Sequence, residues 1–140
     1  MLVTDGEGRP LAATIDSASR YEAHIAEAVL DRVVVHRRRG RPRKRPESIV
    51  ADKGYDSDAF RRALWRRGIR PAIPFKRVRR PRPGPAPDLS GYRQRWRVEA
   101  AFAFLGQFRR FVVRWEHNAQ TYLALIFIAC TVITMRAILG

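Results

Sequence analysis

The stretch IVADKGYDSDAF, residues 49–60, decides the fold. The apolar run Ile49–Ala51 has the composition of a short buried strand, and it ends abruptly at a carboxylate, Asp52, shortly before Gly54. In open α/β sheets, ligand sites gather at the carboxyl ends of strands. Asp52 is therefore a candidate site residue, and the plainer alternative is that it accepts backbone N–H groups in the turn after the strand.

A helix is predicted directly after this strand. The segment DSDAFRRALWRRG, residues 56–68, opens with capping residues and closes with a glycine, which indicates a helix from about 57 to 67. Phe60 and Leu64 lie on its apolar face, so we expect them in the core. We expect the arginines of this helix to face the solvent.

The remaining pattern alternates strands and helices along the 140 residues. We expect strands at 1–3, 11–15, 48–51 and 69–75 and helices at 20–33, 57–67, 90–108 and 119–138. The strand at 69–75 belongs at a sheet edge because it contains two prolines. The segment 109–117 is compatible with a strand or a loop. This order predicts one α/β domain with a mixed sheet flanked by helices.

The charge balance points to a polyanionic partner. The chain carries 28 Lys and Arg against 13 Asp and Glu, a formal net charge of +15. Nucleic acid is favoured over a membrane surface because the charge is spread over loops and several elements. Cys130 is the one cysteine, which excludes an internal disulfide and a cysteine-rich zinc site and fits a reducing compartment.

The termini show no targeting or spanning signal. The first ten residues, MLVTDGEGRP, have neither a basic lead nor a long apolar core. Residues 122–135 are apolar, but this run is shorter than the ~20 residues of a spanning helix, and Arg136 follows it. We therefore expect a buried helix here, no membrane partner, and a bacterial cytoplasmic protein.

Two basic segments are candidate DNA contacts. The loop 36–47 contains RRRGRPRKR, seven basic residues in nine, and a proline- and arginine-rich linker spans 76–88. The tetrapeptide RGRP resembles an AT-hook, a short protein arm that lies in the narrow minor groove of A/T-rich DNA. The alternative is a loop that contacts phosphates without a preference for sequence. Arg109 and Arg110 lie among aromatic residues. This pattern fits two alternatives equally well: contact with a DNA end, or a core of aromatic residues with arginines that only face the solvent.

A second carboxylate stands out in the predicted helix 90–108. At helical spacing Glu99 shares a mostly apolar stripe with Tyr92, Trp96, Ala103 and Gly106, where an isolated carboxylate is costly. Pairing with Arg95 is the structural alternative. Carboxylates such as Asp52 and Glu99 are the hard oxygen ligands that magnesium prefers.

At these residues the sequence resembles a known family. The segments VTDGEGRPLAATIDSASRYE, IVADKGYDSDAFRRALWRRGIRPAIP and the one beginning YRQRWRVEAAFAFLGQFRRF are similar to the carboxyl-terminal part of DDE-type insertion-sequence transposases. The resemblance covers nearly the whole chain and implies an RNase H-like, retroviral-integrase fold. It implies that Asp52 and Glu99 are catalytic and hold two Mg²⁺ or Mn²⁺ ions, and that the partner is double-stranded DNA at transposon ends. The candidate DNA-binding residues are then Arg37, Arg38, Arg39, Arg41, Arg43, Lys44, Arg45, Lys53, Tyr92, Arg95, Arg109 and Arg110.

Two departures from the family pattern qualify this picture. The family often has a basic residue seven positions after the glutamate, where this chain has Gly106. The first catalytic aspartate of the family would lie upstream of Met1, and neither Asp5 nor Asp16 matches it. We therefore expect an N-terminally truncated catalytic domain that is inactive alone and relies on an upstream fragment or on self-association.

Two other functions remain open at this stage. The chain could be a non-catalytic, basic DNA-binding remnant of a transposase. For the transposase fragment and the remnant alike we expect a location at the bacterial nucleoid. It could also be an RNA-binding protein, although its aromatics fall in helical apolar stripes and not on an exposed sheet.

Overall fold

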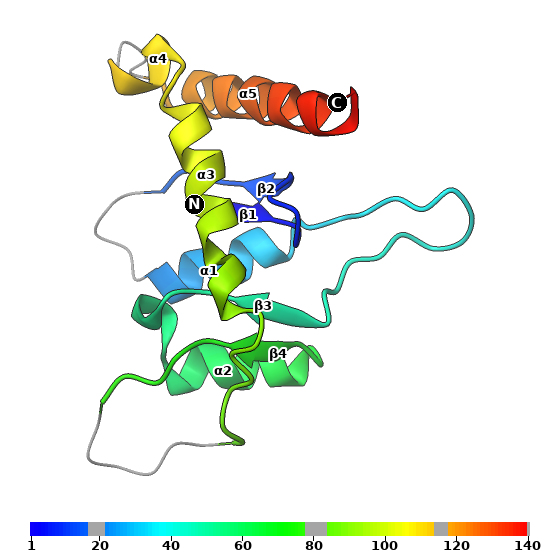
Figure 1. The fold of residues 1–140 in the computed structure, drawn as a ribbon, viewed down its shortest axis with the longest axis vertical. Coiled ribbons are helices and arrows are strands. Elements are labelled where there is room, and N and C mark those ends of the chain that lie inside the picture. Colours follow the sequence, from blue (N-terminus) through cyan, green and yellow to red (C-terminus); the bar gives the residue numbers. More distant parts are fainter. Residues whose placement is uncertain (17–21, 78–83, 114–117, 140) are drawn as a thin grey trace. The chain divides into compact units, whose positions relative to one another are not determined.

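The computed structural model describes residues 1–16, 22–77, 84–113 and 118–139, and these form two compact units (Figure 1). Unit 1 comprises residues 1–18 and 96–140, and unit 2 comprises residues 19–95. The division places the two ends of the sequence in one unit and the central part in the other.

An antiparallel hairpin opens unit 1. Strand β1 (Leu2–Thr4) pairs with β2 (Pro10–Ala13). Asp5 shapes the turn, because its Oδ1 accepts the backbone N–H groups of Glu7 at 2.8 Å and Arg9 at 2.9 Å. The predicted hairpin is confirmed, with the second strand ending at Ala13 and not at residue 15.

In the described part of unit 1 the hairpin is followed by helices α3 (Trp96–Leu105), α4 (Arg109–Val112) and α5 (Ala119–Leu139). Helix α3 packs on β1 and α5, and α5 packs on β2. The core of this unit consists of Leu2, Ala13, Ala101, Leu105, Ala129 and Cys130. Burial raises the pKa of the Cys130 thiol, so this cysteine is a packing residue with little thiolate at neutral pH.

Unit 2 is built on a strand–helix–strand motif. Strand β3 (Ser48–Val50) pairs in parallel with β4 (Arg70–Ala72), and α2 (Asp58–Arg66) connects them. Helix α1 (Glu22–Leu30) packs on α2. Phe60 and Leu64 are each 1% exposed, which confirms the predicted core face of α2.

Both ends of α2 follow the capping signals in the sequence. Ser57 is the N-cap, and its hydroxyl accepts the Phe60 N–H at 3.2 Å. At the other end Gly68 adopts a φ of 67°, its N–H donates to the Trp65 carbonyl at 2.8 Å, and the Ile69 N–H donates to the Leu64 carbonyl at 2.9 Å. This is a Schellman motif, and it turns the chain from α2 into β4.

The sheet prediction is only partly confirmed. The described strands form two separate two-stranded sheets, β1–β2 and β3–β4, and not one mixed sheet. The α/β class is nevertheless correct. The proline at position 71 is accommodated because β4 has a single partner strand in the part of the chain that the structure describes.

The predicted helix 90–108 is divided. A 3₁₀ turn, η2 (Tyr92–Arg95), precedes α3, and α3 ends at Leu105, immediately before Gly106. Glycine is a poor helix former, which explains the end. Helix α4 covers the start of the ambiguous segment 109–117, and residues 114–117 lie outside the described residues.

The predicted burial of the C-terminal helix is wrong. Within the described part of α5, Ala129 and Cys130 are the buried residues, whereas Ile128 is 60% exposed and Leu139 is 78% exposed. The helix is apolar on all sides, and its neighbours cover one side. By length and composition it is one helix that could cross a membrane, which on its own is weak evidence.

The left-handed glycine after α2 gives a first prediction. We expect Gly68→Ala to lower the free energy of unfolding by about 1–2 kcal/mol, the cost of a side chain in the left-handed region. The new Cβ would also lie 3.0 Å from Nη1 of Arg45. Urea denaturation measures the loss. Gly91→Ala is the control, because Gly91 lacks a positive φ and its Cβ would meet only ordinary contacts. Equal stability of the two variants would contradict the prediction.

Candidate active site and nucleic-acid interface

Strand β3 carries Asp52 to its carboxyl end. Asp52 is the N-cap of the 3₁₀ turn η1 (Lys53–Tyr55), and its Oδ1 accepts the Lys53 N–H at 2.7 Å. The turn-capping alternative for Asp52 is therefore observed. The Asp52 side chain is also 58% exposed, so its oxygens retain room for a ligand from outside the chain.

Two further predicted site residues lie beside Asp52 in unit 2. Nη1 of Arg95 is 3.4 Å from Oδ2 of Asp52, and the Arg95 guanidinium lies 5.7 Å from the centre of the Tyr92 ring. The structure thus brings Asp52, Tyr92 and Arg95 together from segments forty residues apart in the sequence. Because both charged groups are partly exposed, this ion pair contributes little stability. Lys53 is exposed next to it.

A buried ion pair, which the sequence did not indicate, lies at the end of the turn that follows Asp52. Arg61, predicted to face the solvent, is 0% exposed, and its Nε donates to Oδ1 of Asp56 at 2.7 Å. Its Nη2 donates to the Ile73 carbonyl at 2.6 Å, and its guanidinium lies 4.3 Å from the centre of the Phe75 ring. A full positive charge can be buried here because a carboxylate, a carbonyl and an aromatic face surround it.

The same carboxylate holds a second segment. Oδ2 of Asp56 accepts the backbone N–H of Lys76 at 2.6 Å, and Nζ of Lys76 donates to the Gly54 carbonyl at 3.0 Å. Asp56 therefore connects the turn after Asp52, helix α2 and the segment after β4. The signal in the sequence was the second aspartate of ADKGYDSD, which reads there as a helix cap.

Glu99 lies on α3 in unit 1, where it is exposed. Trp96 is 59% exposed, and Ala103 and Gly106 are also exposed, so the stripe predicted as a buried apolar face is wrong. The core face of α3 is instead the side of Ala101 and Leu105. Because Glu99 is exposed, it is not a carboxylate on a buried apolar face, and its approach to Asp52 stays a prediction.

The Asp52 carboxylate is the type of ligand that a hard divalent cation prefers. An exposed carboxylate at a strand end is a ligand that Mg²⁺ and Mn²⁺ accept. The described residues contain no group of three or more His, Cys, Asp or Glu side chains that could hold a metal. The role of Asp52 as a metal ligand therefore stays a prediction.

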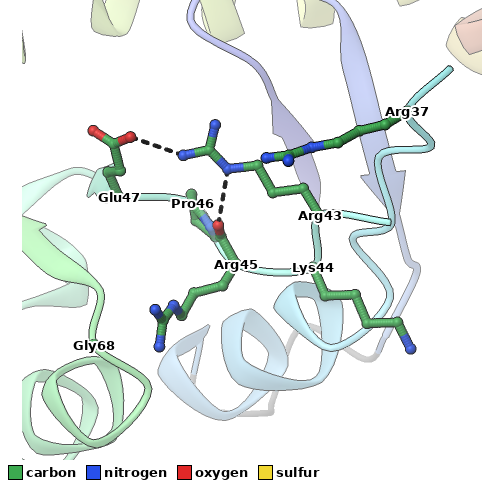
Figure 2. A pocket seen from close by; sticks show the side chains of 7 residues that line it. All are labelled: Arg37, Arg43, Lys44, Arg45, Pro46, Glu47 and Gly68. Carbon is green, nitrogen blue, oxygen red and sulfur yellow. Dashed lines mark hydrogen bonds and ion pairs between the residues drawn. The ribbon is translucent and has the colours of Figure 1, made fainter. Parts of the chain in front are cut away.

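Two arginines of the basic loop 36–47, Arg43 and Arg45, are held by hydrogen bonds within the protein (Figure 2). Arg43 is held by the protein, since its Nη2 lies 2.9 Å from Oε1 of Glu47 and its Nε donates to the Arg45 carbonyl at 3.4 Å. Arg45 donates to the Arg67 carbonyl at 3.1 Å. An open pocket of about 560 Å³ is lined by Arg37, Arg43, Lys44, Arg45, Pro46, Glu47 and Gly68.

The aromatic residues near Arg109 pack on one another. Phe104, Phe108, Phe111 and Tyr122 form a series of edge-to-face pairs with ring centres 5.6, 5.8 and 5.6 Å apart. Phe108 and Phe111 are partly buried against the core of unit 1. This favours the structural role for these aromatics, while Arg109 is exposed. The Arg110 side chain lies outside the described residues.

Comparisons with known proteins identify the family of this chain. The family model for the transposase DDE domain matches residues 1–134. The chain belongs to the transposase DDE-domain family. It is 36% identical over 133 residues to the "Putative transposase for insertion sequence element IS402" of Burkholderia cepacia, a match that covers 94% of this chain. The chain spans 60% of the length of that transposase. A search of solved structures found no match.

The buried pair of this DDE-domain chain gives a second prediction. We expect Arg61→Ala to lower the free energy of unfolding by about 3–5 kcal/mol, because it leaves the Asp56 carboxylate buried without its cation. Arg62→Ala, at an exposed position on the same helix, should change stability by less than about 0.5 kcal/mol. The midpoints and slopes of the urea unfolding curves give both free-energy changes.

A double variant separates the lost charge pair from the lost volume. Asp56→Asn with Arg61→Met keeps an acceptor for the Lys76 N–H and removes both charges, so it should recover much of the stability lost in Arg61→Ala. If Arg61→Ala unfolds at the same urea concentration as Arg62→Ala, the buried pair does not stabilise unit 2.

Proposed function

We propose that this chain acts in DNA transposition as part of an RNase H-like DDE catalytic domain. The observation that carries the proposal is the position of Asp52 at the carboxyl end of β3, beside Tyr92 and Arg95. These residues match the aspartate, tyrosine and arginine of the transposase motif that the sequence resembles, and the family membership supports the assignment.

Asp52 and Glu99 are the proposed catalytic carboxylates and metal ligands, with Mg²⁺ or Mn²⁺ as the ion. When bound, such ions activate a water or 3′-hydroxyl and stabilise the leaving oxygen in phosphoryl transfer. The work of this chain is to hold the carboxylates. For Asp52, the capped turn η1 and the buried Asp56–Arg61 pair below it fix the backbone that presents the carboxylate.

The proposed partner is double-stranded DNA at transposon ends. Arg95 is positioned to neutralise charge close to Asp52, and Lys53 and the exposed arginines of the loop 36–47 extend the basic surface within unit 2. Each phosphate contacted by such a residue releases counterions, so binding should weaken as salt rises. We place the protein in the bacterial cytoplasm at the nucleoid, with a further transposase segment or a second copy as partner.

One observation favours a second candidate, the non-catalytic DNA-binding remnant. The Asp52 carboxylate already accepts the Lys53 N–H and lies 3.4 Å from Arg95, and the exposed basic residues of the loop 36–47 do not depend on it. A protein with this surface could bind DNA without holding a metal. Metal binding therefore separates the two candidates.

The test is metal-directed cleavage of the protein backbone. Fe²⁺ bound in place of Mg²⁺, with ascorbate and peroxide, cuts the chain close to the ion. We expect fragments that end near both residue 52 and residue 99, because the two carboxylates share the metal site. Asp52→Asn and Glu99→Gln should each abolish both cuts, since each removes a ligand.

Glu47→Gln is the matched control, because it removes one exposed carboxylate of unit 2 away from Asp52. It should leave the fragment pattern unchanged. Cuts near only one of the two positions, or cuts that persist in both site variants, would contradict a shared site and favour the remnant.

A further inference from the structure

The basic loop contains a closed arm, residues 36–42. Its base is a β-bridge in which the Val35 N–H donates to the Arg43 carbonyl and the Arg43 N–H donates to the Val35 carbonyl, each at 2.8 Å. Gly40, with a φ of 88°, turns the chain near the tip, and a Cβ there would meet nothing within 4 Å. The tip of the arm around Gly40 therefore stands clear of the described part of unit 2, whereas Arg37 lines the pocket at its foot.

The cations on this arm are unpaired. Arg37, Arg38, Arg39 and Arg41 are exposed, and none of them forms a hydrogen bond or ion pair with a described residue. No acidic residue occurs between Asp31 and Glu47. Arg43 and Arg45, at the foot of the arm, are held by Glu47 and by carbonyl groups. The loop thus divides into a fixed base and a free, strongly positive tip.

We propose that the arm enters the minor groove of duplex DNA and prefers A/T-rich segments. This inference rests on the proposal that the protein acts on DNA, and it adds the groove and the kind of sequence that the arm contacts. The four arginines of the arm supply the contacts, and the bridge between Val35 and Arg43 holds them together.

Charge and shape both favour the minor groove. A/T-rich DNA has a narrow minor groove with enhanced negative potential, which attracts inserted arginines. The tip sequence, RRRGRP, has no aromatic and no amide side chain, so it lacks the Asn or Gln that pairs with adenine in the major groove. A glycine and a proline keep the backbone slim, which allows close approach to the groove floor.

The test compares three duplexes of equal length whose central base pairs are all A·T, all G·C or all inosine·C. An I·C pair lacks the guanine amino group, so it resembles A·T in the minor groove and G·C in the major groove. We expect the A·T and I·C duplexes to bind alike, and on the order of tenfold more tightly than the G·C duplex. Fluorescence anisotropy with the whole chain measures the three affinities.

The variant Arg39→Gln with Arg41→Gln should remove this preference, and a matched urea midpoint shows that it folds. Arg62→Gln with Arg66→Gln removes the same charge from exposed positions on α2 and should retain the preference. If I·C binds like G·C, or all three duplexes bind equally, the groove assignment is wrong and salt-dependent DNA binding still stands. Failure to bind any duplex would contradict both the minor-groove assignment and the proposal that the chain binds DNA. The Fe²⁺ cleavage experiment tests the metal site separately, because it requires neither the arm nor DNA.

Discussion

The buried pair between Arg61 and Asp56 is the constraint on which the candidate site in unit 2 depends. Both side chains are fully buried, so neither charge can be satisfied by water. The pair ties α2 to the turn that follows Asp52, and through Ile73 and Lys76 it ties both to the segment after β4. An apolar pair could fill the same volume, but it would offer no acceptor to the Lys76 N–H. The polar solution therefore fixes a particular loop geometry, and Asp52 stands on that loop.

Features encoded by neighbouring residues could be predicted from the sequence. The limits of α2 follow from Ser57 and Gly68, which act on backbone groups within a few positions. The hairpin follows from the turn chemistry around Asp5. The position of Asp52 at a strand end needed only a short apolar run and a break in it. In each case the interaction that decides the structure joins residues only a few positions apart in the sequence.

Features that depend on distant partners could not be predicted in this way. Arg61 is an arginine among arginines on an amphipathic helix, and only the carbonyl of Ile73 and the ring of Phe75 make its burial possible. The exposure of Glu99 follows from which face of α3 meets β1 and α5. Helix α5 is apolar on every side, so composition alone cannot show which side is covered. The association of Arg95 with Asp52 required the chain to return across forty residues.

The net charge of +15 therefore does not show which cations contact DNA. Arg61 is neutralised inside unit 2, and Arg67 is shared between Glu27 at 3.7 Å and Asp31 at 3.0 Å. Arg43 and Arg45 shape the foot of the loop 36–47. A cation already paired with the protein gains less from a phosphate than a free one, because the first partner must be given up. What distinguishes the tip of that loop is thus the combination of four exposed arginines close together in the sequence with the absence of competing partners for them among the described residues.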